Sequence, residues 1–414
     1  MIIIFIYVFL HVDIRKKGGF SMKCTKVQKS VSITIFLTIL GSFCYFFDFA
    51  ITEKNFYSSG ETLGNFLKTS ISVESPILID AQAIGVDAHN WTWASSQYWC
   101  NGSGTKLDPY RISYLEIDGM GVNNCIEIKN SKNPYFTIEH CDLYKGGSNI
   151  SNTISASIFL NNSMNGKIYS NNLTESTSQL ACGIYIKNCT SIEVSSNNMS
   201  NNFYGILVSH SYASNITGNI IQDNKFMGAS IQDISQTINL DHNLINNNLE
   251  GVSTLNSSYI WIWNNLIKNN YDNVICTDCY LIYVQNNTIS KGEYGIYIQE
   301  CNTIEVWANT IQKNQHGVSL KVSDTNSIKD NKIINNYYYP LKLEQSNNNN
   351  ILRNIITGNK ETVIQIECKD NYFEENIIFN QPEQTLLIIV VVLVGFVCVT
   401  GILIYRKIKM RKLG

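Results

Sequence analysis

Acidic side chains and a histidine recur at one spacing in the second half of the chain, where they could do acid–base chemistry. Glu250, Asp272, Tyr294 and His316 follow one another at intervals of 22 residues. If 22 residues make one turn of a repetitive fold, neighbouring members of this set lie about 5 Å apart. Two carboxylates at that separation suit a retaining glycosidase, and they could also hold a cation. Solvated turn residues give the same pattern, so Glu250, Asp272 and His316 are weak catalytic candidates.

Aromatic residues at the same spacing could bind sugar rings. One set reads Trp261, Tyr283 and Glu305, and a second set reads Trp263, Gln285 and Trp307. Both sets alternate with apolar residues, as expected for the outer face of a strand. Aromatic rings with nearby polar groups suit a sugar, which offers an apolar face and a hydroxyl edge. The candidate ligand-binding residues are Trp261, Trp263, Tyr283, Glu305 and Trp307. Aromatic stacking that only supports a sheet is the alternative interpretation.

Nine of the 12 cysteines lie between Cys100 and Cys368, so at least one of these nine is unpaired. Cys279 and Cys301 are one 22-residue interval apart, which would place their Cα atoms within disulfide range. This pair is a disulfide candidate, and a ladder of small buried thiols is the alternative. Cys276 and Cys279 form a single CxxC without a second one, and Cys276 falls at an inward-facing position. The sequence therefore predicts neither a metal site nor a cofactor.

A recurring asparagine sets the interval of about 22 residues. An Asn shortly before an aliphatic residue occurs at Asn172, Asn198, Asn219, Asn243, Asn265, Asn287, Asn309, Asn331, Asn354 and Asn376. A repeat of this length predicts a solenoid. Each repeat holds three short alternating apolar segments, and Asn, Ser, Thr, Tyr and Ile favour turns and strands over helices. The expected fold is therefore all-β, a parallel β-helix of about 11–12 coils over residues 112–380, in which each Asn has a structural role at a turn.

A single coil would not be stable alone. It buries about five aliphatic side chains, each of which contributes about 1.5–3 kcal/mol. Ordering its residues costs at least about 1 kcal/mol for each of them. Neighbouring coils must therefore supply the missing stabilisation along the axis.

The repeats resemble those of right-handed, single-stranded parallel β-helix proteins. These include copper-insertion accessory (NosD-type) proteins and carbohydrate-binding and sugar-hydrolase β-helix domains. The stretch 101–112 resembles the segment that opens many such helices, and the resemblance covers about two-thirds of the chain. It implies the fold and little about function, because that fold hosts lyases, hydrolases, adhesins and accessory proteins. Residues 76–111, which hold Trp91, Trp93 and Trp99, are expected to cap the first coil.

Copper handling, which the NosD-type resemblance raises, calls for clusters of imidazole and thioether groups. The histidines of the repeats and of the segment before them are instead scattered in the sequence: His89, His140, His210, His242 and His316. The sequence therefore disfavours copper handling.

Apolar segments near both ends place the repeats outside the cytoplasm. Residues 386–405 carry no charge and are long enough to cross a bilayer as a helix, and the basic tail 406–414 then lies in the cytoplasm. Residues 22–50 begin with lysines and continue with an apolar run, as in a signal peptide or an N-terminal anchor. Residues 1–21 are a possible over-extended start, and residues 51–75 are a linker.

The net charge of the chain bears on which partners it can bind, and its glycosylation sequons bear on its export. Eleven of the 31 Lys and Arg residues and two of the 33 acidic residues lie before residue 51 or after residue 405, so the remainder has a net charge near −11. Such a surface disfavours nucleic acid, whose phosphates need clustered cations. About ten Asn-X-Ser/Thr sequons between Asn90 and Asn286 agree with export, although an Asn-rich chain also produces them by chance.

Together these features predict a membrane-anchored, extracytoplasmic β-helix that binds a glycan or another surface protein through its side wall. One alternative is a carbohydrate-active enzyme, a polysaccharide lyase or a glycoside hydrolase, that uses Glu250 and Asp272. Another is a structural spacer or a surface-layer component. The sequence favours binding over catalysis.

Overall fold

The computed structural model describes residues 72–148, 153–176, 180–358 and 362–380. The chain divides into two compact units, residues 1–68 and 69–414, and every described residue belongs to the second. The predicted segments 1–21, 22–50, 386–405 and 406–414 lie outside the described residues. Within the described ranges, no helix has the length and apolar character needed to cross a bilayer.

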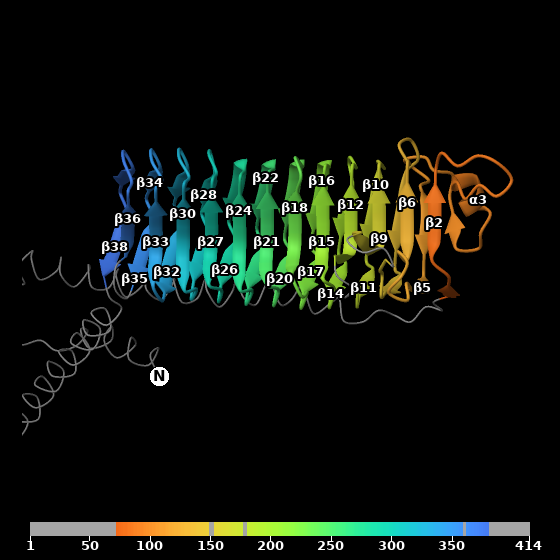
Figure 1. Cartoon of the computed structure of the whole chain (residues 1–414), viewed down its shortest axis with the longest axis horizontal. Coiled ribbons are helices and arrows are strands. Elements are labelled where there is room, and N and C mark those ends of the chain that lie inside the picture. The colour runs from red at the N-terminus through yellow and green to blue at the C-terminus, as the bar shows by residue number, and fades with distance from the viewer. Residues whose placement is uncertain (1–71, 149–152, 177–179, 359–361, 381–414) are drawn as a thin grey trace, which may run out of the picture. The chain divides into compact units, whose positions relative to one another are not determined.

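Three parallel sheets run the length of the described unit, and the strands of each sheet stack side by side along one axis (Figure 1). Sheet A contains β1 (Ser72–Glu74), β5 (Leu115–Asp118), β8 (Asp142–Tyr144), β11 (Asn172–Thr174), β14 (Asn198–Ser200), β17 (Ile220–Gln222), β20 (Leu244–Asn246), β23 (Leu266–Lys268), β26 (Thr288–Ser290), β29 (Thr310–Gln312), β32 (Lys332–Asn336), β35 (Ile355–Gly358) and β38 (Ile377–Asn380). Sheet B contains β2 (Ile77–Asp80), β6 (Ile126–Lys129), β9 (Ser155–Asn161), β12 (Ala181–Lys187), β15 (Tyr204–Ser209), β18 (Met227–Gln232), β21 (Glu250–Leu255), β24 (Asp272–Thr277), β27 (Tyr294–Gln299), β30 (His316–Lys321), β33 (Tyr339–Glu344) and β36 (Val363–Ile366). Sheet C contains β3 (Cys100–Asn101), β4 (Tyr110–Ser113), β7 (Phe136–Glu139), β10 (Gly166–Tyr169), β13 (Glu193–Ser195), β16 (Tyr212–Thr217), β19 (Gln236–Asp241), β22 (Ser258–Trp263), β25 (Tyr280–Gln285), β28 (Glu305–Trp307), β31 (Ser327–Lys329), β34 (Asn350–Leu352) and β37 (Tyr372–Glu374).

The chain visits the sheets in the order C, A, B in every turn, so one coil is three strands. This is a right-handed parallel β-solenoid of about 12 turns, which confirms the all-β, parallel β-helix part of the predicted fold. The strand pairing also includes β1 and β2, which precede the range 112–380 in the sequence and pair with β5 and β6. Among the described strands, β3 and β4 form the one antiparallel pair.

The first coil is covered by α3 (Trp91–Ser95), which lies at one end of the stack (Figure 1). Its N-cap is Asn90, whose side chain accepts hydrogen bonds from the backbone N–H groups of Thr92 and Trp93. Trp91 is buried, stacks on Tyr110 with ring centroids 4.6 Å apart, and donates its indole N–H to Ser131 Oγ at 2.9 Å. The apolar interior of the first coil is thereby shielded from water.

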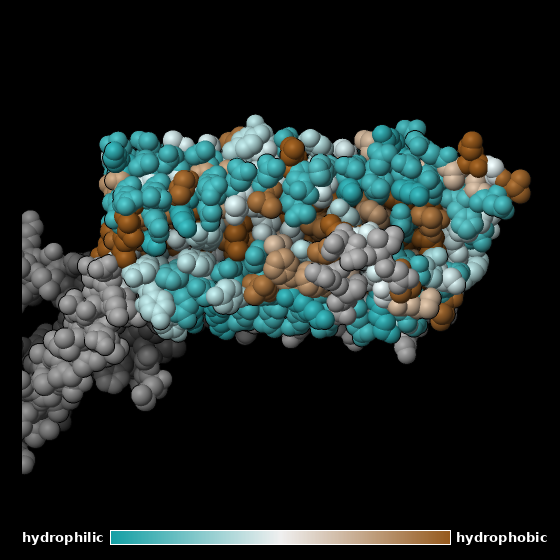
Figure 2. Space-filling model, viewed as in Figure 1, coloured by the Kyte–Doolittle hydropathy of each residue, from teal (hydrophilic) through white to brown (hydrophobic). Residues whose placement is uncertain are grey.

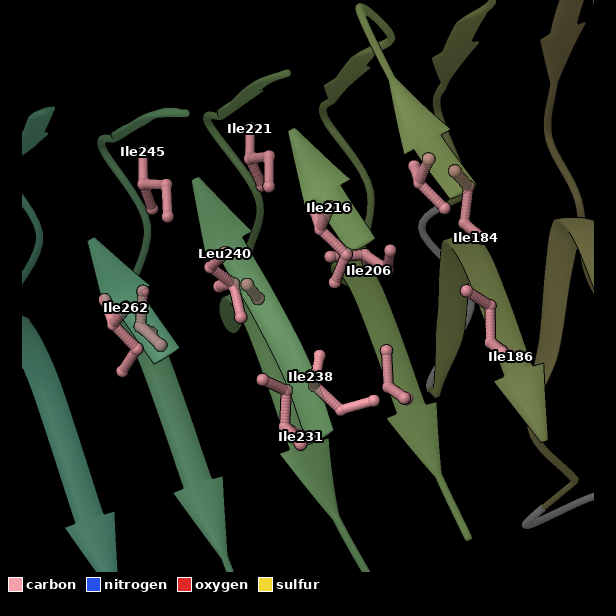
Figure 3. Packing of buried hydrophobic residues seen from close by; sticks show 14 of the residues in the cluster. Ile184, Ile186, Ile206, Ile216, Ile221, Ile231, Ile238, Leu240, Ile245 and Ile262 are labelled. Carbon is pink, nitrogen blue, oxygen red and sulfur yellow. The ribbon is translucent and has the colours of Figure 1, made fainter. Parts of the chain in front are cut away.

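The core is a continuous column of aliphatic side chains between the three sheets. Figure 3 shows inward-pointing residues from all three, among them Ile206 from sheet B, Ile221 from sheet A and Ile238 from sheet C. Each of these side chains has no exposed surface. Equivalent residues of successive coils are register partners, as Ile184 and Ile206 are. The period-2 alternation in the sequence therefore separates this core from the outer wall.

Buried asparagines connect the coils at the corner between sheets C and A. At Asn219, the side-chain Oδ1 accepts from the backbone N–H of Asn197 at 2.9 Å and from its Nδ2 at 3.1 Å. Asn219 in turn donates its own backbone N–H and its Nδ2 to Oδ1 of Asn243, at 2.9 Å and 3.0 Å. Nδ2 of Asn219 also donates to the backbone carbonyl of Val194 at 3.0 Å. The Asn219 amide therefore satisfies backbone groups of the preceding coil and bonds to the side chain of the next.

This asparagine ladder corrects two positions of the predicted repeat. The buried amides of the early coils belong to Asn171 and Asn197, which bond to each other, rather than to Asn172 and Asn198. Asn172 and Asn198 are partly buried and form a separate row that begins at Asp142. A doublet of asparagines leaves the register ambiguous by one residue, and a shift of one residue moves a side chain to the opposite face.

Removal of one ladder amide should destabilise the solenoid. Asn219→Ala leaves the backbone N–H of Asn197 and the carbonyl of Val194 without their partners. We expect the free energy of unfolding to fall by at least about 2 kcal/mol, since each unsatisfied buried group costs about 1–3 kcal/mol. Urea unfolding would measure the change. Asn215→Ala, an exposed asparagine of the same coil, is the control, and equal stability of the two variants would contradict the ladder's role.

Candidate functional site

The predicted aromatic residues lie together on the outer face of sheet C. The register pairs Trp261 with Tyr283 and Tyr283 with Glu305, and it pairs Trp263 with Gln285 and Gln285 with Trp307. These positions belong to β22, β25 and β28, three successive strands of the sheet. We call Trp261, Trp263, Tyr283, Glu305 and Trp307 the aromatic strip. All five residues selected from the sequence therefore lie on one surface.

The rings of the aromatic strip differ in how accessible they are. Trp261 and Tyr283 stack with centroids 5.4 Å apart and planes 12° from parallel, and both are half-buried. Trp263 and Trp307 keep 36% and 40% of their surface exposed. These two lie in the same row two coils apart, with Gln285 between them, so about 9–10 Å separates their backbones. The strip thus offers two accessible indoles beside a rigid stacked pair.

The carboxylates at the two ends of the strip have polar partners. Beyond Trp307, Lys329 Nζ lies 2.7 Å from Glu305 Oε2 and 5.5 Å from the centroid of the Trp307 ring. Before Trp263, Asp241 accepts a hydrogen bond from Asn264 at 3.0 Å and lies 2.6 Å from His242 Nδ1. A ligand on the strip therefore meets indole rings and amide groups between an ion pair at one end and a hydrogen-bonded carboxylate at the other.

Two further aromatic residues were not recognised from the sequence. Tyr259 and Tyr280 lie at the start of β22 and β25, are 41% and 49% exposed, and contact each other edge to face at 6.1 Å. Tyr259 adopts a left-handed backbone conformation with φ of 54°, which interrupts the alternation that marks outward positions. They are also 21 residues apart rather than 22, so the repeat interval does not pair them in the sequence.

The acidic candidates lie on another part of the solenoid, where each turn passes from sheet A to sheet B. Glu250, Asp272, Tyr294 and His316 open β21, β24, β27 and β30, and the register pairs each with the next. We call these four residues the corner column. Glu250 and Asp272 are neighbours, whereas Tyr294 separates His316 from Asp272. The structure therefore brings the two carboxylates together and leaves the imidazole two coils away.

Burial dominates the electrostatics of the carboxylate pair. It raises the pKa of Asp272 to about 6, and the nearby charges of Glu293 and Glu250 act in the same direction. The backbone N–H of Tyr294 donates to Asp272 Oδ1 at 3.3 Å and lowers this pKa in part. Burial also raises the pKa of Glu250, and a hydrogen bond with Ser253 opposes that shift.

His316 is held between aromatic rings. Tyr294 and Tyr339 stack on its two sides with centroids 4.9 Å and 5.3 Å away. Its Nδ1 is shielded from solvent and has no hydrogen-bond partner. Burial lowers the pKa of His316 more than the neighbouring Glu293 raises it. The neutral imidazole therefore has a packing role in this column.

Cys279 and Cys301 are free thiols in this structure, one coil apart, in the arrangement that the alternative interpretation describes. The sulfur of Cys301 accepts a hydrogen bond from the backbone N–H of Cys279 at 3.2 Å. The backbone N–H of Cys301 donates to Ser323 Oγ, and that of Ser323 donates to Ser346 Oγ. Both thiols therefore take part in a ladder of small side chains at the corner between sheets B and C, and the disulfide stays a prediction.

Copper handling would call for a cluster of ligand side chains. In the parts of the chain that the structure describes, no three His, Cys, Asp or Glu side chains are grouped so that they could hold a metal ion. Eight of the nine described thiols are buried, and burial raises the pKa of several of them, that of Cys141 to about 12. A thiolate ligand is therefore disfavoured at these positions.

Comparison with known proteins identifies a family. The model of the family described as "Periplasmic copper-binding protein (NosD)" matches residues 110–278 and 262–388, which together exceed half of the chain. No curated protein matches this sequence significantly.

Several solved structures are similar over most of the solenoid. A mutant of the periplasmic alginate epimerase AlgG is 13% identical, with a TM-score of 0.47 over 75% of this chain and 79% of that one. The A-module of the Azotobacter vinelandii mannuronan C-5 epimerase AlgE6 is 10% identical, with a TM-score of 0.39 over 66% and 89%. DFA-IIIase from Arthrobacter chlorophenolicus A6 is 10% identical, with a TM-score of 0.43 over 69% and 80%. These values do not bear on what this chain binds.

A second ladder of buried amides lies beneath the corner column, and in one coil the amide comes from a different position of the repeat. In this ladder Asn248 donates its backbone N–H to Asn270, and Asn314 donates to Asn336, but Gly292 occupies the intervening ladder position. Asn273 bridges the gap by accepting from Asn270 and donating to Asn314, each at 3.0 Å. A Cβ added at Gly292 would lie 2.5 Å from Asn273 Nδ2, so the two positions are complementary.

This complementarity predicts that two destabilising substitutions compensate each other when they are combined. Asn273→Gly alone should destabilise the protein because Asn270 and Asn314 lose their bridge, and Gly292→Asn alone should do so through a steric clash. The double variant should recover stability, since the new amide takes the space that Asn273 vacates. Thermal unfolding of all four proteins gives the coupling energy, which we expect to be about 0.5–3 kcal/mol. Additive losses would contradict the exchange.

The raised pKa of Asp272 predicts a pH dependence of stability. The folded state holds this proton more tightly than the unfolded state, whose pKa is near the ordinary value of 3.8. Stability contributed by Asp272 is therefore present below about pH 4 and is lost as the pH rises to about 6. Asp272→Asn removes this term, so the wild type should lose stability relative to the variant across that window. Urea unfolding at several pH values would show it, and a constant difference would contradict it.

Proposed function

The chain belongs to the NosD family, and we propose that it works outside the cytoplasm by binding a glycan on the aromatic strip. The observation that carries this proposal is the pair of accessible indoles, Trp263 and Trp307, beside the stacked Trp261 and Tyr283. Indole faces pack against the apolar face of a sugar ring, and the spacing of the two indoles suits an extended oligosaccharide. The ligand lies along the solenoid axis, across β22, β25 and β28.

Polar groups within the strip support a glycan over a protein partner. Gln285 lies between the two indoles, and Asn239 is the register neighbour of Trp261. Their amides can donate to and accept from hydroxyl groups at the edge of a sugar. A stable protein interface would need a larger apolar centre than these rings supply. The face that Figure 2 shows is formed mainly by the outward residues of sheet B rather than by the strip, and it is largely hydrophilic with scattered hydrophobic side chains.

Charge narrows the class of glycan. Asp241 lies beside the strip and Glu305 is part of it, and the region between the two apolar segments of the chain has a net charge near −11. Lys329, the cation of this surface, is already paired with Glu305. Neutral glycans are therefore favoured over polyanionic ones, because each anionic group would approach a surface whose net charge is negative and where the nearby Lys329 already has a carboxylate partner.

Attachment to the membrane is part of the same proposal. Residues 386–405 would form the anchor and residues 406–414 the cytoplasmic tail, both beyond the described residues. The apolar, uncharged character of the first segment and the five basic residues of the second support it. The anchored solenoid would then present sheet C to glycans at the cell surface.

Glycan-array binding of the full-length protein tests the proposal. The wild type should bind neutral oligosaccharides, and Trp261→Ala/Trp263→Ala should weaken the best ligand about tenfold or more, since each aromatic contact contributes about 0.5–1.5 kcal/mol beyond its buried area. Isothermal titration calorimetry gives the dissociation constants. Tyr98→Ala, which removes an exposed aromatic residue from the N-terminal region, is the control and should bind like the wild type. Wild-type protein that binds no glycan, or a double variant with unchanged affinity, would reject the proposal.

A further inference from the structure

The two ends of the solenoid differ in how their core is covered. The first coil is shielded by α3, whereas β36, β37 and β38 are the last described strands of their sheets. No described strand pairs with the outer edges of these three strands. Ile378 shows the consequence, because it keeps 44% of its surface exposed although its register partner Ile356 is fully buried. The described part of the chain therefore leaves the apolar core open at its C-terminal end.

The outer wall of sheet A also becomes apolar towards this end. One outward row runs from Thr310 through Lys332 and Ile355 to Ile377, so two polar side chains are followed by two aliphatic ones. Phe379, two residues further along β38, shares the outward face with Ile377. Ile377 and Phe379 are 52% and 51% exposed. Figure 2 shows hydrophobic side chains at this end of the stack, where Figure 1 places β36 and β38.

Most charged side chains of the last described coil lie away from sheet A. Glu374 belongs to β37 of sheet C, and Glu367, Lys369 and Asp370 lie at the turn from sheet B to sheet C. All four are exposed, as is Glu375 at the turn from sheet C to sheet A. Sheet A therefore presents the apolar side of this end, and the remaining sides carry a net negative charge that would repel an anionic surface.

The sequence places this end close to the membrane anchor proposed above, on which this inference rests. Five residues, 381–385, separate the last residue of β38 from the apolar segment 386–405. Five extended residues span at most about 18 Å. An anchor formed by 386–405 would thus hold the open end of the core beside the lipid surface.

From these observations we propose that the last coil docks on the lipid bilayer through its sheet A side. Ile377, Ile378 and Phe379 enter the boundary between headgroups and acyl chains, where amphipathic protein surfaces bury their apolar face. The headgroups are neutral or zwitterionic, because the acidic side chains of the same coil are repelled by an anionic leaflet. Lipid then shields the core at this end, as α3 does at the other.

The bilayer contact sets where the aromatic strip is presented. In sheet C, β22, β25 and β28 lie five, four and three positions before β37. At the strand spacing of a sheet, the strip is about 14–24 Å from the last coil along the axis. A glycan on the strip is therefore bound outside the headgroup layer, on a wall whose end rests on the lipid.

Photolabelling of the full-length protein from within the bilayer tests the contact. The protein is reconstituted in phosphatidylcholine liposomes that contain a phosphatidylcholine with a diazirine near its headgroup, and lipid adducts are located by peptide mass spectrometry after irradiation. Adducts on residues 377–379 should exceed those on residues 91–99 by about tenfold or more, because about 50 Å of solenoid separates the two ends. Adducts within 386–405 report the anchor in the same sample.

A double variant tests which side chains make the contact. Ile377→Ser/Phe379→Ser should lower the labelling of β38 several-fold and leave the labelling of 386–405 unchanged, because it removes apolar contact and keeps the connection to the anchor. Leu255→Ser changes a 44% exposed apolar residue of sheet B and is the matched control, which should label like the wild type. Circular dichroism verifies that each variant folds, and the labelling of the wild type does not depend on either variant.

The possible failures are distinguishable. Labelling of 386–405 without labelling of 377–379 would overturn the docking and leave the anchor standing, and a second copy of the chain seated on this end would give that result. Equal labelling of 91–99 and 377–379 would also overturn it, since the solenoid would then lie flat. Absence of labelling on 386–405 would overturn the anchor and this inference together. Glycan binding at the strip does not use β38, so it stands or falls separately.

Discussion

The buried amide of each ladder asparagine is the interaction on which the rest of the molecule depends. At every turn a parallel β-solenoid must bury backbone N–H and C=O groups that no strand partner satisfies. The side chain of Asn243 satisfies two of them on the preceding coil, because it accepts from the backbone N–H of Asn219 and donates to the carbonyl of Ile216, and it also donates to the side-chain oxygen of Asn265 on the next coil. Each amide bonds to the next coil at about the strand spacing of a sheet, so the ladder and the sheets enforce the same rise.

That constraint decides where the sequence can vary. The interval between ladder asparagines is 22 residues from Asn265 to Asn287, 24 from Asn219 to Asn243 and 26 from Asn171 to Asn197. The additional residues enter the turns, while the register of the strands is kept. Outward side chains of successive coils therefore form straight rows, and a surface is built by choosing one residue per coil. Both the aromatic strip and the corner column are rows of this kind.

This regularity explains how much the sequence could predict. The 22-residue interval was sufficient for the fold and for the neighbours of Tyr283 and Asp272, because both follow from counting. It was insufficient where a side chain crosses between coils, as Asn273 does to replace the amide missing at Gly292. It also misplaced the ladder at the doublet of Asn171 and Asn172, and it gave no indication of how burial raises the pKa of Asp272. Those properties depend on packing in three dimensions, which spacing alone does not encode.

The two surfaces use the same scaffold under opposite electrostatic conditions. At the strip, the carboxylate of Glu305 is paired with Lys329, so the indoles act on a ligand without a strong field. At the corner, burial raises the pKa of both Glu250 and Asp272, and the charges of Glu293 and Glu250 raise that of Asp272 further. A buried pair of carboxylates costs stability, and the rigid stack of coils can hold it because the ladder amides fix the backbone beneath it. The same scaffold can therefore carry rows of different chemistry on different sheets, since the ladder keeps all three sheets in register along the same axis.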